Sequence, residues 1–416
     1  MNDAATSQKN GTGGFQVRVT NLLSETPMAG ARVRVADPAG DTVLMELETD
    51  SSGQTPAVEL SAPPLDYSLE PTDQKPYAEY NVLVFAENCV PKLIEGVQIF
   101  ADSMALQNTG LNRAVGTAET VQSLLLPQHT LWGEFPPKIP EPEIKPLPPS
   151  GGLVVLPSPV IPEYIVVHLG VPTDTEAQNV WIPFKEYIKS VASSEIYSTW
   201  PESTLEANIL AIISFTLNRV YTEWYRGQGY EFTITNSTAY DQSFQQGRTI
   251  YTSISQVVDR LFTTYVTRPA IRQPLLTQYC DGKRTNCDGL EQWGSKSLGD
   301  DGLDSLSILR RYYGNTVFLK QAETVSGIPI SFPGEILESG SSGAAVRTVQ
   351  QQINAVAGSY PAVPKVRVDG VYGPQTQESV RIFQQIFDLP QTGNVDYATW
   401  YELSRIYVIV SKLAEL

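Results

Sequence analysis

A proline-rich segment between residues 127 and 162 sets the main constraint on the fold, because it contains 11 of the chain's 30 prolines. Proline fixes its φ angle and has no backbone N–H, so such a segment does not continue a helix or lie inside a sheet. The stretch Phe135–Pro142 has the composition of a polyproline II helix, which extends by about 3.1 Å per residue. We therefore predict separate domains joined by a semi-rigid spacer.

The length of 416 residues fits a chain of several domains. We expect an N-terminal β-sandwich, a central α+β domain and a C-terminal all-α domain of three helices. The predicted segments, in chain order, are a flexible tail at 1–14, the sandwich at 15–108, the proline-rich linker at 109–162, the central domain at 163–325, a shorter linker at 326–338 and the three-helix domain at 339–416.

Acidic residues outnumber basic ones, with 45 Asp and Glu against 29 Lys and Arg, and the net charge is −16. Nucleic acids and anionic membranes are bound by clustered Lys and Arg, so we expect neither as the main partner. Glycans are bound by aromatic and hydrogen-bonding side chains, and the chain has 6 Trp, 20 Tyr and 13 Phe. No stretch approaches the roughly 18 apolar residues of a transmembrane helix, so no membrane span is expected.

The N-terminal residues 15–108 show the alternation of β-strands. Phe15, Val17 and Val19 fall on one face of a strand, and Asp50–Gly53 is a turn between strands. Together with the run Pro27–Val33, this pattern resembles the carboxypeptidase-regulatory or transthyretin-like sandwich. The resemblance implies a structural domain, and no catalytic residue depends on it.

The C-terminal residues change to a helical pattern with a tight turn at Asp369–Gly370 and a chain reversal at Gly373–Pro374. Apolar residues recur at helical spacing in three groups, which are Val346, Val349 and Ile353, then Val380, Phe383 and Phe387, then Trp400, Leu403 and Ile406. The spacing predicts three short helices around one small core.

Several motifs occur here in a fixed order, namely Gly343-x-x-Val346-x-x-Val349-Gln350, Asp369-Gly370-x-Tyr372-Gly373-x-x-Thr376, Val380-x-x-Phe383-Gln384, Leu389-x-x-Thr392-Gly393 and Thr399-Trp400-x-x-Leu403. This order resembles the three-helix peptidoglycan-binding domain of wall hydrolases and implies peptidoglycan as the ligand. Asp369, Tyr372 and Gln384 are the candidate ligand contacts. Most motif positions are also explained by the core, the turns and the caps, and such a domain can serve as a protein-docking module instead.

The central residues 163–325 combine strand and helix signals, which favours an α+β domain. Residues 164–169 read as a strand, and residues 183–192, 205–225 and 254–265 show apolar positions at helical spacing. The motifs, in order, are Val180-Trp181-Ile182-Pro183-Phe184, Ser193-Ser194-Glu195, Thr199-Trp200-Pro201, Thr238-Ala239-Tyr240-Asp241-Gln242, Gln278-Tyr279-Cys280-Asp281-Gly282, Gln292-Trp293-Gly294 and Ile308-Leu309-Arg310-Arg311-Tyr312-Tyr313-Gly314.

This motif order resembles the stage II sporulation protein D family, also called the amidase-enhancer LytB family. The resemblance implies a lytic transglycosylase that cleaves the bond between N-acetylmuramate and N-acetylglucosamine, with Glu195 as the catalytic acid. A protonated Glu donates to the glycosidic oxygen and then accepts the proton of the sugar's own 6-hydroxyl, so one carboxyl group is enough. Its pKa must be raised by a partly apolar pocket, which Trp200 and its neighbours could supply.

Five residues of the matched motifs have side chains suited to sugar binding by stacking or hydrogen bonding, and they are Trp200, Asp241, Gln242, Gln292 and Trp293. The chain also departs from the family pattern. Ile213 stands where an Arg is common, and Asn286 stands where a His is common. Arg219 is too far along the helix to replace that Arg closely.

Cys280 and Cys287 are separated by six residues, and some relatives of the family hold zinc with Cys and His. A tetrahedral zinc site needs four N or S ligands, and the chain adds only His129 and His168. A local disulfide or two free thiols is therefore the favoured interpretation over zinc, and no cofactor is expected. Cys89 ends a strand pattern and is expected to be packed.

Two functions follow from these patterns. The first is a wall-remodelling transglycosylase held on peptidoglycan glycan strands by its own binding domain. The second is a non-catalytic wall-binding scaffold or an activator of a cell-wall amidase. A concave cleft in which Gln242 and Gln292 converge on Glu195 would favour the enzyme. The resemblance to the sporulation family implies a Gram-positive spore former. Residues 1–6 lack the pattern of a signal peptide, which fits a protein made in the mother cell or held in the spore. We therefore expect the cell envelope, or the spore or mother-cell compartment.

Overall fold

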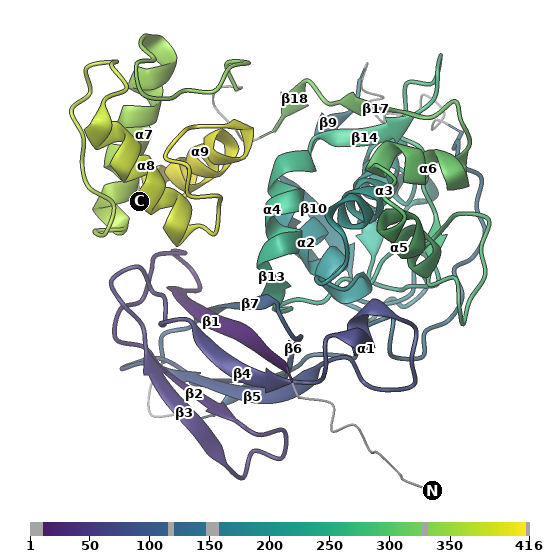
Figure 1. Ribbon diagram of the computed structural model, residues 1–416, viewed down its shortest axis with the longest axis horizontal. Helices are drawn as coiled ribbons and strands as arrows, with labels where there is room; N and C mark the ends of the chain where they lie inside the picture. Colours follow the sequence, from purple (N-terminus) through teal and green to yellow (C-terminus); the bar gives the residue numbers. More distant parts are fainter. Residues whose placement is uncertain (1–10, 115–119, 147–157, 327–331, 413–416) are drawn as a thin grey trace, which may run out of the picture.

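The structure, a computed structural model, describes residues 11–114, 120–146, 158–326 and 332–412. Figure 1 shows three regions, with N-terminal sheets, a central mixed α/β region and three C-terminal helices. The predicted fold class is therefore confirmed. Within the described residues, no helix has the length and apolar character needed to cross a membrane.

The N-terminal region consists of two sheets, and the apolar strand face predicted from the sequence is buried between them. Its elements are β1 (Gly11–Asn21), β2 (Arg32–Ala36), β3 (Val43–Glu48), β4 (Val58–Ala62), α1 (Asp66–Leu69), β5 (Ala78–Phe85), β6 (Lys92–Ile99), β7 (Met104–Leu111) and β8 (Gln122–Leu125). The first sheet has the order β13-β7-β1-β4, in which β13 (Ile250–Tyr251) comes from the central region, and the second has the order β3-β2-β5-β6-β8. Phe15, Val17 and Val19 are fully buried between them, as their alternation predicts.

The flexible tail predicted at residues 1–14 extends too far, because residues 11–14 belong to β1. This strand begins at Gly11 and pairs with β4 from its first residue. Residues 1–10 lie outside the described residues. The glycines reflect close packing: a Cβ at Gly13 would overlap the carbonyl oxygen of Phe100. A glycine-rich run therefore marks a close contact between strands here and not a flexible end.

The proline-rich segment that we expected to act as a spacer lies against the central region. We call residues 127–146 the strap. Its backbone forms hydrogen bonds with that region, from Ile139 N to Ala239 O at 2.7 Å and from Leu276 N to Glu143 O at 2.8 Å. Polyproline backbone has no internal hydrogen bonds, so its polar groups are free to pair with neighbours. Residues 147–157 of the predicted linker lie outside the described residues.

In the central region the long helix α3 packs against the helices α2, α4, α5 and α6 and against the strand β14. Its elements are β9 (Val160–Ile161), β10 (Tyr164–His168), β11 (Asn179–Pro183), α2 (Phe184–Glu195), α3 (Glu202–Tyr221), η1 (Arg226–Gln228), β12 (Ile234–Thr235), β13 (Ile250–Tyr251), α4 (Thr252–Leu261), β14 (Thr264–Thr267), β15 (Tyr279–Cys280), β16 (Leu290–Glu291), α5 (Gln292–Asp300), α6 (Ser305–Tyr313), β17 (Phe318–Gln321) and β18 (Thr324–Val325).

One predicted helix in this region is too long. The helix expected at 254–265 ends at Leu261, and the residues Thr264–Thr267 form β14, which pairs with β17 in antiparallel register. The run Thr-Tyr-Val-Thr consists of β-branched and aromatic residues, which favour a strand over the continuation of the helix.

The N-terminal and central regions share a sheet and a core. Strand β13 of the central region pairs with β7 of the N-terminal sheet. Around the junction, Phe100 packs against the rings of Tyr77, Tyr197 and Tyr251 at centroid distances of 5.2–5.4 Å. Aromatic contacts of this kind hold the two regions in a fixed relation.

The C-terminal region contains the three predicted helices, α7 (Ala344–Ser359), α8 (Pro374–Ile386) and α9 (Tyr397–Lys412). Pro374 occupies the first turn of α8, where its missing N–H has no helical partner to lose. The apolar faces predicted from the sequence meet in one core, and Val346, Val349 and Phe383 have no exposed surface.

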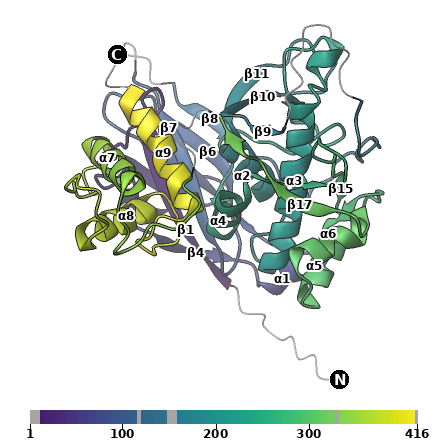
Figure 2. The same ribbon diagram turned by 90° about the horizontal axis from the view of Figure 1, so that it is seen from above.

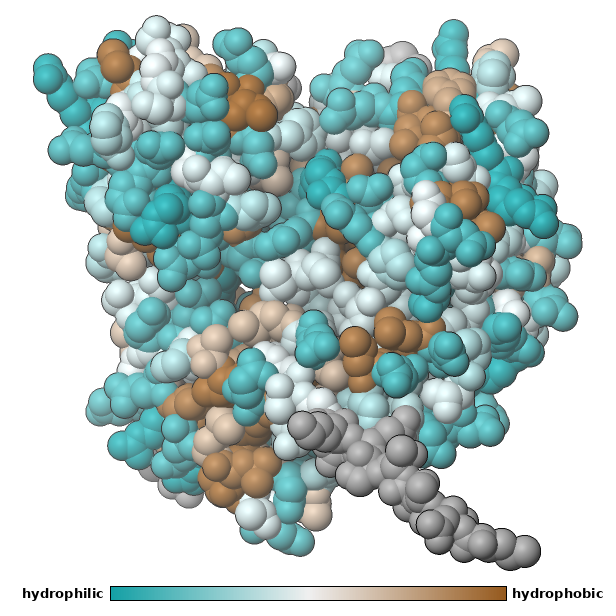
Figure 3. All heavy atoms as spheres, viewed as in Figure 1, coloured by the Kyte–Doolittle hydropathy of each residue, from teal (hydrophilic) through white to brown (hydrophobic). Residues whose placement is uncertain are grey.

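This region also packs against the other two, as Figure 2 shows for α9 beside the central helices. Lys185 of α2 forms an ion pair with Glu402 of α9 at 2.6 Å, and Gln54 of the N-terminal region donates to Ile386 O at 2.8 Å. The face in Figure 3 is mostly hydrophilic, with apolar residues in separate patches. The three regions therefore form one body in this structure.

Candidate functional site

A cleft with a volume of about 630 Å³ lies at the end of α2, between the central region and the strap. One wall is the strap, and the opposite wall is the loop 280–287 that follows β15. The residues that line the cleft are Thr130, Gly133, Glu134, Phe135, Pro136, Pro137, Lys138, Glu195, Thr238, Tyr279, Cys280, Asp281, Arg284, Thr285, Asn286 and Gln292. Its size is that of a pocket for an organic ligand.

Glu195 is the last residue of α2, and its side chain faces this cleft although only 3% of the residue is exposed. One carboxylate oxygen accepts a hydrogen bond from Ser243 N at 2.7 Å. The other accepts a hydrogen bond from the hydroxyl of Tyr279 on β15. Two donors, one on β15 and one in the loop before β13, therefore fix the orientation of the carboxyl group.

The pKa of Glu195 is raised above its usual value because burial disfavours the charged carboxylate. The positive charge of Lys138 and the hydrogen bonds from Tyr279 and Ser243 act in the opposite direction. The net direction is the one that a general acid needs, since a raised pKa keeps the proton on the carboxyl group closer to neutral pH.

Lys138 brings a cation to Glu195 from the strap. Its amine donates to the main-chain oxygen of Asp241 and lies 4.8 Å from the ring centroid of Tyr279 and 5.1 Å from that of Phe215. Burial lowers the pKa of Lys138, while Glu195 and Asp241 act to raise it. Sequence reasoning missed this residue, because nothing in a proline-rich run predicts that it folds back over a carboxyl group.

The strap is anchored by an ion-pair cluster beside the cleft. Arg219 of α3 contacts Glu141 of the strap at 2.6 Å and Asp241 at 2.7 Å, and its side chain has no exposed surface. Lys145 pairs with Glu141 as well. Arg219 therefore does not line the cleft. Ile213, which stands where the resemblance led us to expect an Arg, is a fully buried apolar residue.

The opposite wall is held by a disulfide between Cys280 and Cys287. The side chain of Asp281 accepts hydrogen bonds from the backbone of the same loop. Arg284 at its tip donates to the strap carbonyl oxygens of Leu131, of Trp132 at 2.7 Å and of Gly133 at 2.6 Å. The disulfide loop and the strap therefore support each other across the cleft.

The disulfide also bears on the zinc hypothesis, because both thiols are joined to each other. In the described ranges, no group of three or more His, Cys, Asp or Glu side chains is arranged to hold a metal ion. His129 and His168 are buried in hydrogen bonds elsewhere, His129 with Ile196 O and His168 with Asn179. The residues present do not fit a zinc site.

Of the predicted substrate contacts in the central region, Gln292 lines the cleft, and its amide donates to the main-chain oxygen of Glu195 at 3.0 Å. Gln242 is fully buried and does not line the cleft, but it pairs with Tyr187 and Thr216 and contacts Tyr279, the residue that holds the Glu195 carboxyl. The carboxylate of Asp241 is also fully buried and accepts bonds from Arg219 and from three further groups. Asp241 and Gln242, which we predicted as sugar ligands, thus form hydrogen bonds inside the central region in this structure.

The two tryptophans lie behind the cleft. Trp200 is 3% exposed, and its indole N–H donates to Ser68 O of α1 at 2.9 Å. Trp293 packs against Trp200 with ring centroids 5.0 Å apart and lines a neighbouring hollow instead of the cleft. Trp200 supports the junction with the N-terminal region.

In the C-terminal region, two glutamines hold two loops in the same way. Gln350 of α7 accepts from Gly370 N, and Gln384 of α8 accepts from Gly393 N, each at 2.8 Å. Both glycines have positive φ angles, of 77° and 70°, which suit glycine. Gln384, a candidate ligand residue, is thus buried and holds the loop at Gly393.

The other two candidates in this region differ in exposure. Tyr372 is 1% exposed, and its hydroxyl donates to Gly393 O at 2.8 Å. Asp369 carries its carboxylate at the surface of the turn, where it accepts from Gln350 and from Val371 N. Among the three predicted contacts, Asp369 is the one placed where a ligand can reach it.

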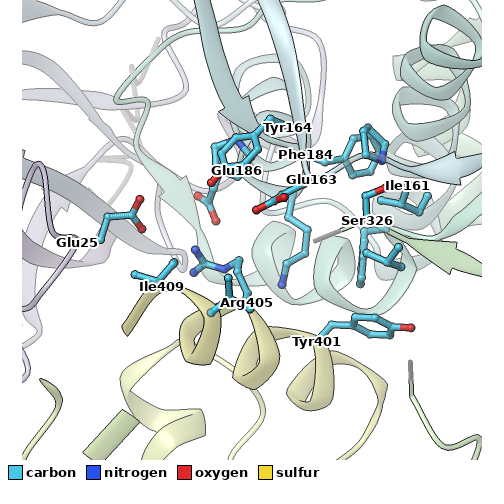
Figure 4. Close-up of a pocket in the computed structure, with 16 residues that line it drawn as sticks. Glu25, Ile161, Glu163, Tyr164, Phe184, Glu186, Ser326, Tyr401, Arg405 and Ile409 are labelled. Carbon is cyan, nitrogen blue, oxygen red and sulfur yellow. The ribbon is translucent and has the colours of Figure 1, made fainter. Parts of the chain in front are cut away.

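A further pocket of about 110 Å³ separates α9 from the central region. Figure 4 shows Arg405 and Tyr401 reaching it from α9, opposite Tyr164 and Phe184. Arg405 pairs with Glu402 on its own helix at 2.6 Å. This pocket belongs to the interface between the regions.

Comparison with known proteins identifies the C-terminal region. A family model described as "Putative peptidoglycan binding domain" matches residues 342–403. The C-terminal region is thus a domain of the peptidoglycan-binding type, and peptidoglycan binding through this domain indicates the cell envelope or cell wall. No curated protein matches the sequence.

Among solved structures, 3-chlorocatechol 1,2-dioxygenase from Rhodococcus opacus is 12% identical with a TM-score of 0.18, over 27% of this chain and 63% of that chain. Wild-type catechol 1,2-dioxygenase from Acinetobacter radioresistens is 13% identical with a TM-score of 0.18, over 30% of this chain and 61% of that chain. A variant of the major pilin subunit of Bacillus cereus is 22% identical with a TM-score of 0.15, over 28% of both chains. This chain thus spans less than two thirds of each, and these likenesses carry no argument.

Proposed function

We propose that the central region cleaves peptidoglycan glycan strands as a lytic transglycosylase with Glu195 as its acid, while the C-terminal domain holds the protein on the wall. The observation that supports this most is the buried carboxyl of Glu195, which faces a cleft of about 630 Å³ and has a raised pKa. The motif resemblance to the stage II sporulation protein D family supports the same chemistry.

The reaction needs one carboxyl group. Protonated Glu195 donates its proton to the glycosidic oxygen as the bond from that oxygen to the anomeric carbon breaks. The resulting carboxylate accepts the proton of the muramyl 6-hydroxyl, whose oxygen bonds to the anomeric carbon and closes a 1,6-anhydro ring. Water is not consumed. Tyr279 and Ser243 N hold the carboxyl in place, and the nearby Lys138 balances its charge once the proton has left.

The test is digestion of purified glycan strands without stem peptides by the wild type and by Glu195→Gln, with products identified by mass spectrometry. We expect anhydro-muramyl ends from the wild type and none from Glu195→Gln. Glu202→Gln is the matched control, because Glu202 lies on the surface of α3 with a side-chain exposure of 67%. Absence of products from the wild type, or equal products from Glu195→Gln, would contradict the proposal.

A second function is favoured by the burial of Gln242 and Asp241, which leaves Gln292 alone among the predicted sugar ligands in the cleft with Glu195. In that case the central region binds glycan, or stimulates a cell-wall amidase, without cleaving. A protein that pellets with peptidoglycan and increases amidase activity, but yields no anhydro ends, would support it. Under either function we propose the wall or spore layers of a Gram-positive spore former as the location.

A further inference from the structure

A second hollow, with a volume of about 410 Å³, lies between the N-terminal and central regions. We call it the sandwich hollow. The residues that line it are Tyr67, Glu70, Pro71, Thr72, Asp73, Gln74, Pro76, Leu131, Trp132, Tyr197, Lys283, Arg284 and Trp293. They come from α1 and the loop after it, from the strap, from the segment after α2 and from the disulfide loop and α5.

The sandwich hollow has the chemistry of a sugar-binding surface. Four of its lining residues are aromatic, and two of them, Tyr67 and Trp132, are only partly buried, so part of each side chain remains accessible. Asp73 and Gln74 are exposed at its edge. Aromatic faces for the C–H side of a sugar ring, beside carboxylate and amide groups for its hydroxyls, are what a glycan requires.

Its aromatic floor is rigid. Trp293 packs against Trp200 and against Tyr197 with ring centroids 5.0 Å and 5.9 Å apart, and Trp200 is fixed by its hydrogen bond to Ser68 O. A rigid floor loses little conformational entropy when a ligand binds, which favours affinity.

The hollow adjoins the cleft at Glu195, and the contact of Arg284 with the strap lies between the two cavities. Arg284 lines both cavities, and the strap contributes Thr130 and Gly133 to the cleft but Leu131 and Trp132 to the hollow. At the start of α5, Gln292 lines the cleft and the next residue, Trp293, lines the hollow. A linear polymer that crosses the strap at Trp132 would therefore occupy both.

We infer that the sandwich hollow binds further sugar units of the glycan strand whose cleaved bond lies at Glu195. This inference rests on the proposed function and extends it, because it makes the N-terminal region part of the substrate-binding surface. Long strands then bind through both cavities, and short fragments bind through the cleft alone.

The test uses the full chain with Glu195→Gln, so that strands are bound without being cut. Hydrogen exchange is measured with and without long glycan strands free of stem peptides. We expect protection of residues 67–76 together with residues 279–292. Adding Trp132→Ala should abolish protection of residues 67–76, retain protection of residues 279–292 and weaken long-strand binding at the central region about tenfold.

Two further variants make the result specific. Tyr67→Ala should have the same effect from the other side of the hollow, which guards against a folding defect of Trp132→Ala. Trp181→Ala is the matched control, since Trp181 on β11 is 68% exposed and lines neither cavity. It should leave protection of both segments unchanged.

The outcomes separate this inference from the proposed function. Protection confined to residues 279–292, with normal cleavage by the wild type, would overturn the sandwich hollow and leave the transglycosylase in place. Protection of residues 67–76 that depends on Trp132, without cleavage by the wild type, would support the hollow and overturn the catalytic assignment.

Discussion

The C-terminal and central regions were both interpreted from ordered motifs, but the motifs have different relations to function in the two. In the C-terminal domain the motif residues build the scaffold, since Gln350 and Gln384 hold the loop glycines Gly370 and Gly393. In the central region the motif residues divide. Glu195 faces a cleft. Asp241 and Gln242, which belong to the same set of motifs, are buried inside the region and do not line that cleft.

This difference shows what a motif reports. In a small domain, turn glycines and buried amides are indispensable to the fold, so their order identifies the domain without locating its binding face. In the central region the cleft is completed by the strap, which lies outside every motif. Its chemistry therefore depends on tertiary contacts that a motif does not contain.

The largest effect on stability is expected at Asp241, which we predicted as a sugar ligand and which instead forms a buried ion pair. Asp241→Asn should lower the free energy of unfolding by about 3–5 kcal/mol, because it leaves the buried guanidinium of Arg219 without one of its two carboxylate partners. Chemical unfolding of both proteins measures this. Asp300→Asn is the control, since Asp300 pairs with Lys296 at the surface with 46% side-chain exposure and should change stability little.

Unchanged stability of Asp241→Asn, accompanied by weaker binding of glycan strands, would reverse the interpretation. Asp241 would then be a sugar ligand that reaches the cleft in a conformation other than the one described here.

The next effect concerns the scaffold of the C-terminal domain. Gln384→Ala leaves Gly393 N without its acceptor and leaves the carbonyl of Asn394 with only the 3.5 Å contact from Thr392, which should cost about 2–3 kcal/mol. Pelleting with insoluble peptidoglycan should fall, while cleavage of soluble strands by the central region should persist. Gln391→Ala, at an exposed position of the same loop, is the control. Loss of pelleting without loss of stability would make Gln384 a ligand contact.

The sequence predicted the parts of the molecule that depend on local periodicity. The alternation of Phe15, Val17 and Val19 indicated the first strand face, and the helical spacing around Val346 and Phe383 indicated the C-terminal core. Glu195 could be proposed only through the family resemblance, since a carboxylate at a helix end is usually solvated. The hydrogen bond from Lys138 to the main-chain oxygen of Asp241 could not be predicted. It joins residues 103 positions apart, and the proline-rich segment that carries Lys138 has no periodic pattern.

A smaller, pH-dependent effect is expected where the C-terminal region meets the other two. Burial raises the pKa of Asp388 from its ordinary 3.8 to about 6. The negative charge of Asp259 also raises this pKa, whereas the positive charges of Lys189 and Arg18 lower it. One carboxylate oxygen accepts from Thr252 at 3.3 Å, and the other is buried without a partner. The protonated form is favoured in the packed state.

A raised pKa contributes stability that is complete below about pH 4 and is lost as the pH rises through about 6. Asp388→Asn imitates the protonated form and suits the positive φ of 59°. Thermal unfolding from pH 4 to pH 8 should therefore show a weaker pH dependence in the variant, by about 1–2 kcal/mol. Identical pH profiles would show that the junction does not exclude water from this carboxyl group.

The smallest effect tests whether the strap acts on the chemistry of the central region. Lys138 lowers the pKa of Glu195 against the effect of burial. Lys138→Gln removes that charge, so the pKa of Glu195 should rise further, and the alkaline limb of the pH–rate profile should move to higher pH by about one unit or less. Lys138→Arg keeps the charge and should keep the profile. A rate that falls equally at every pH would mean that Lys138 only fastens the strap to Asp241, and the cleft would then owe its electrostatics to the central region alone.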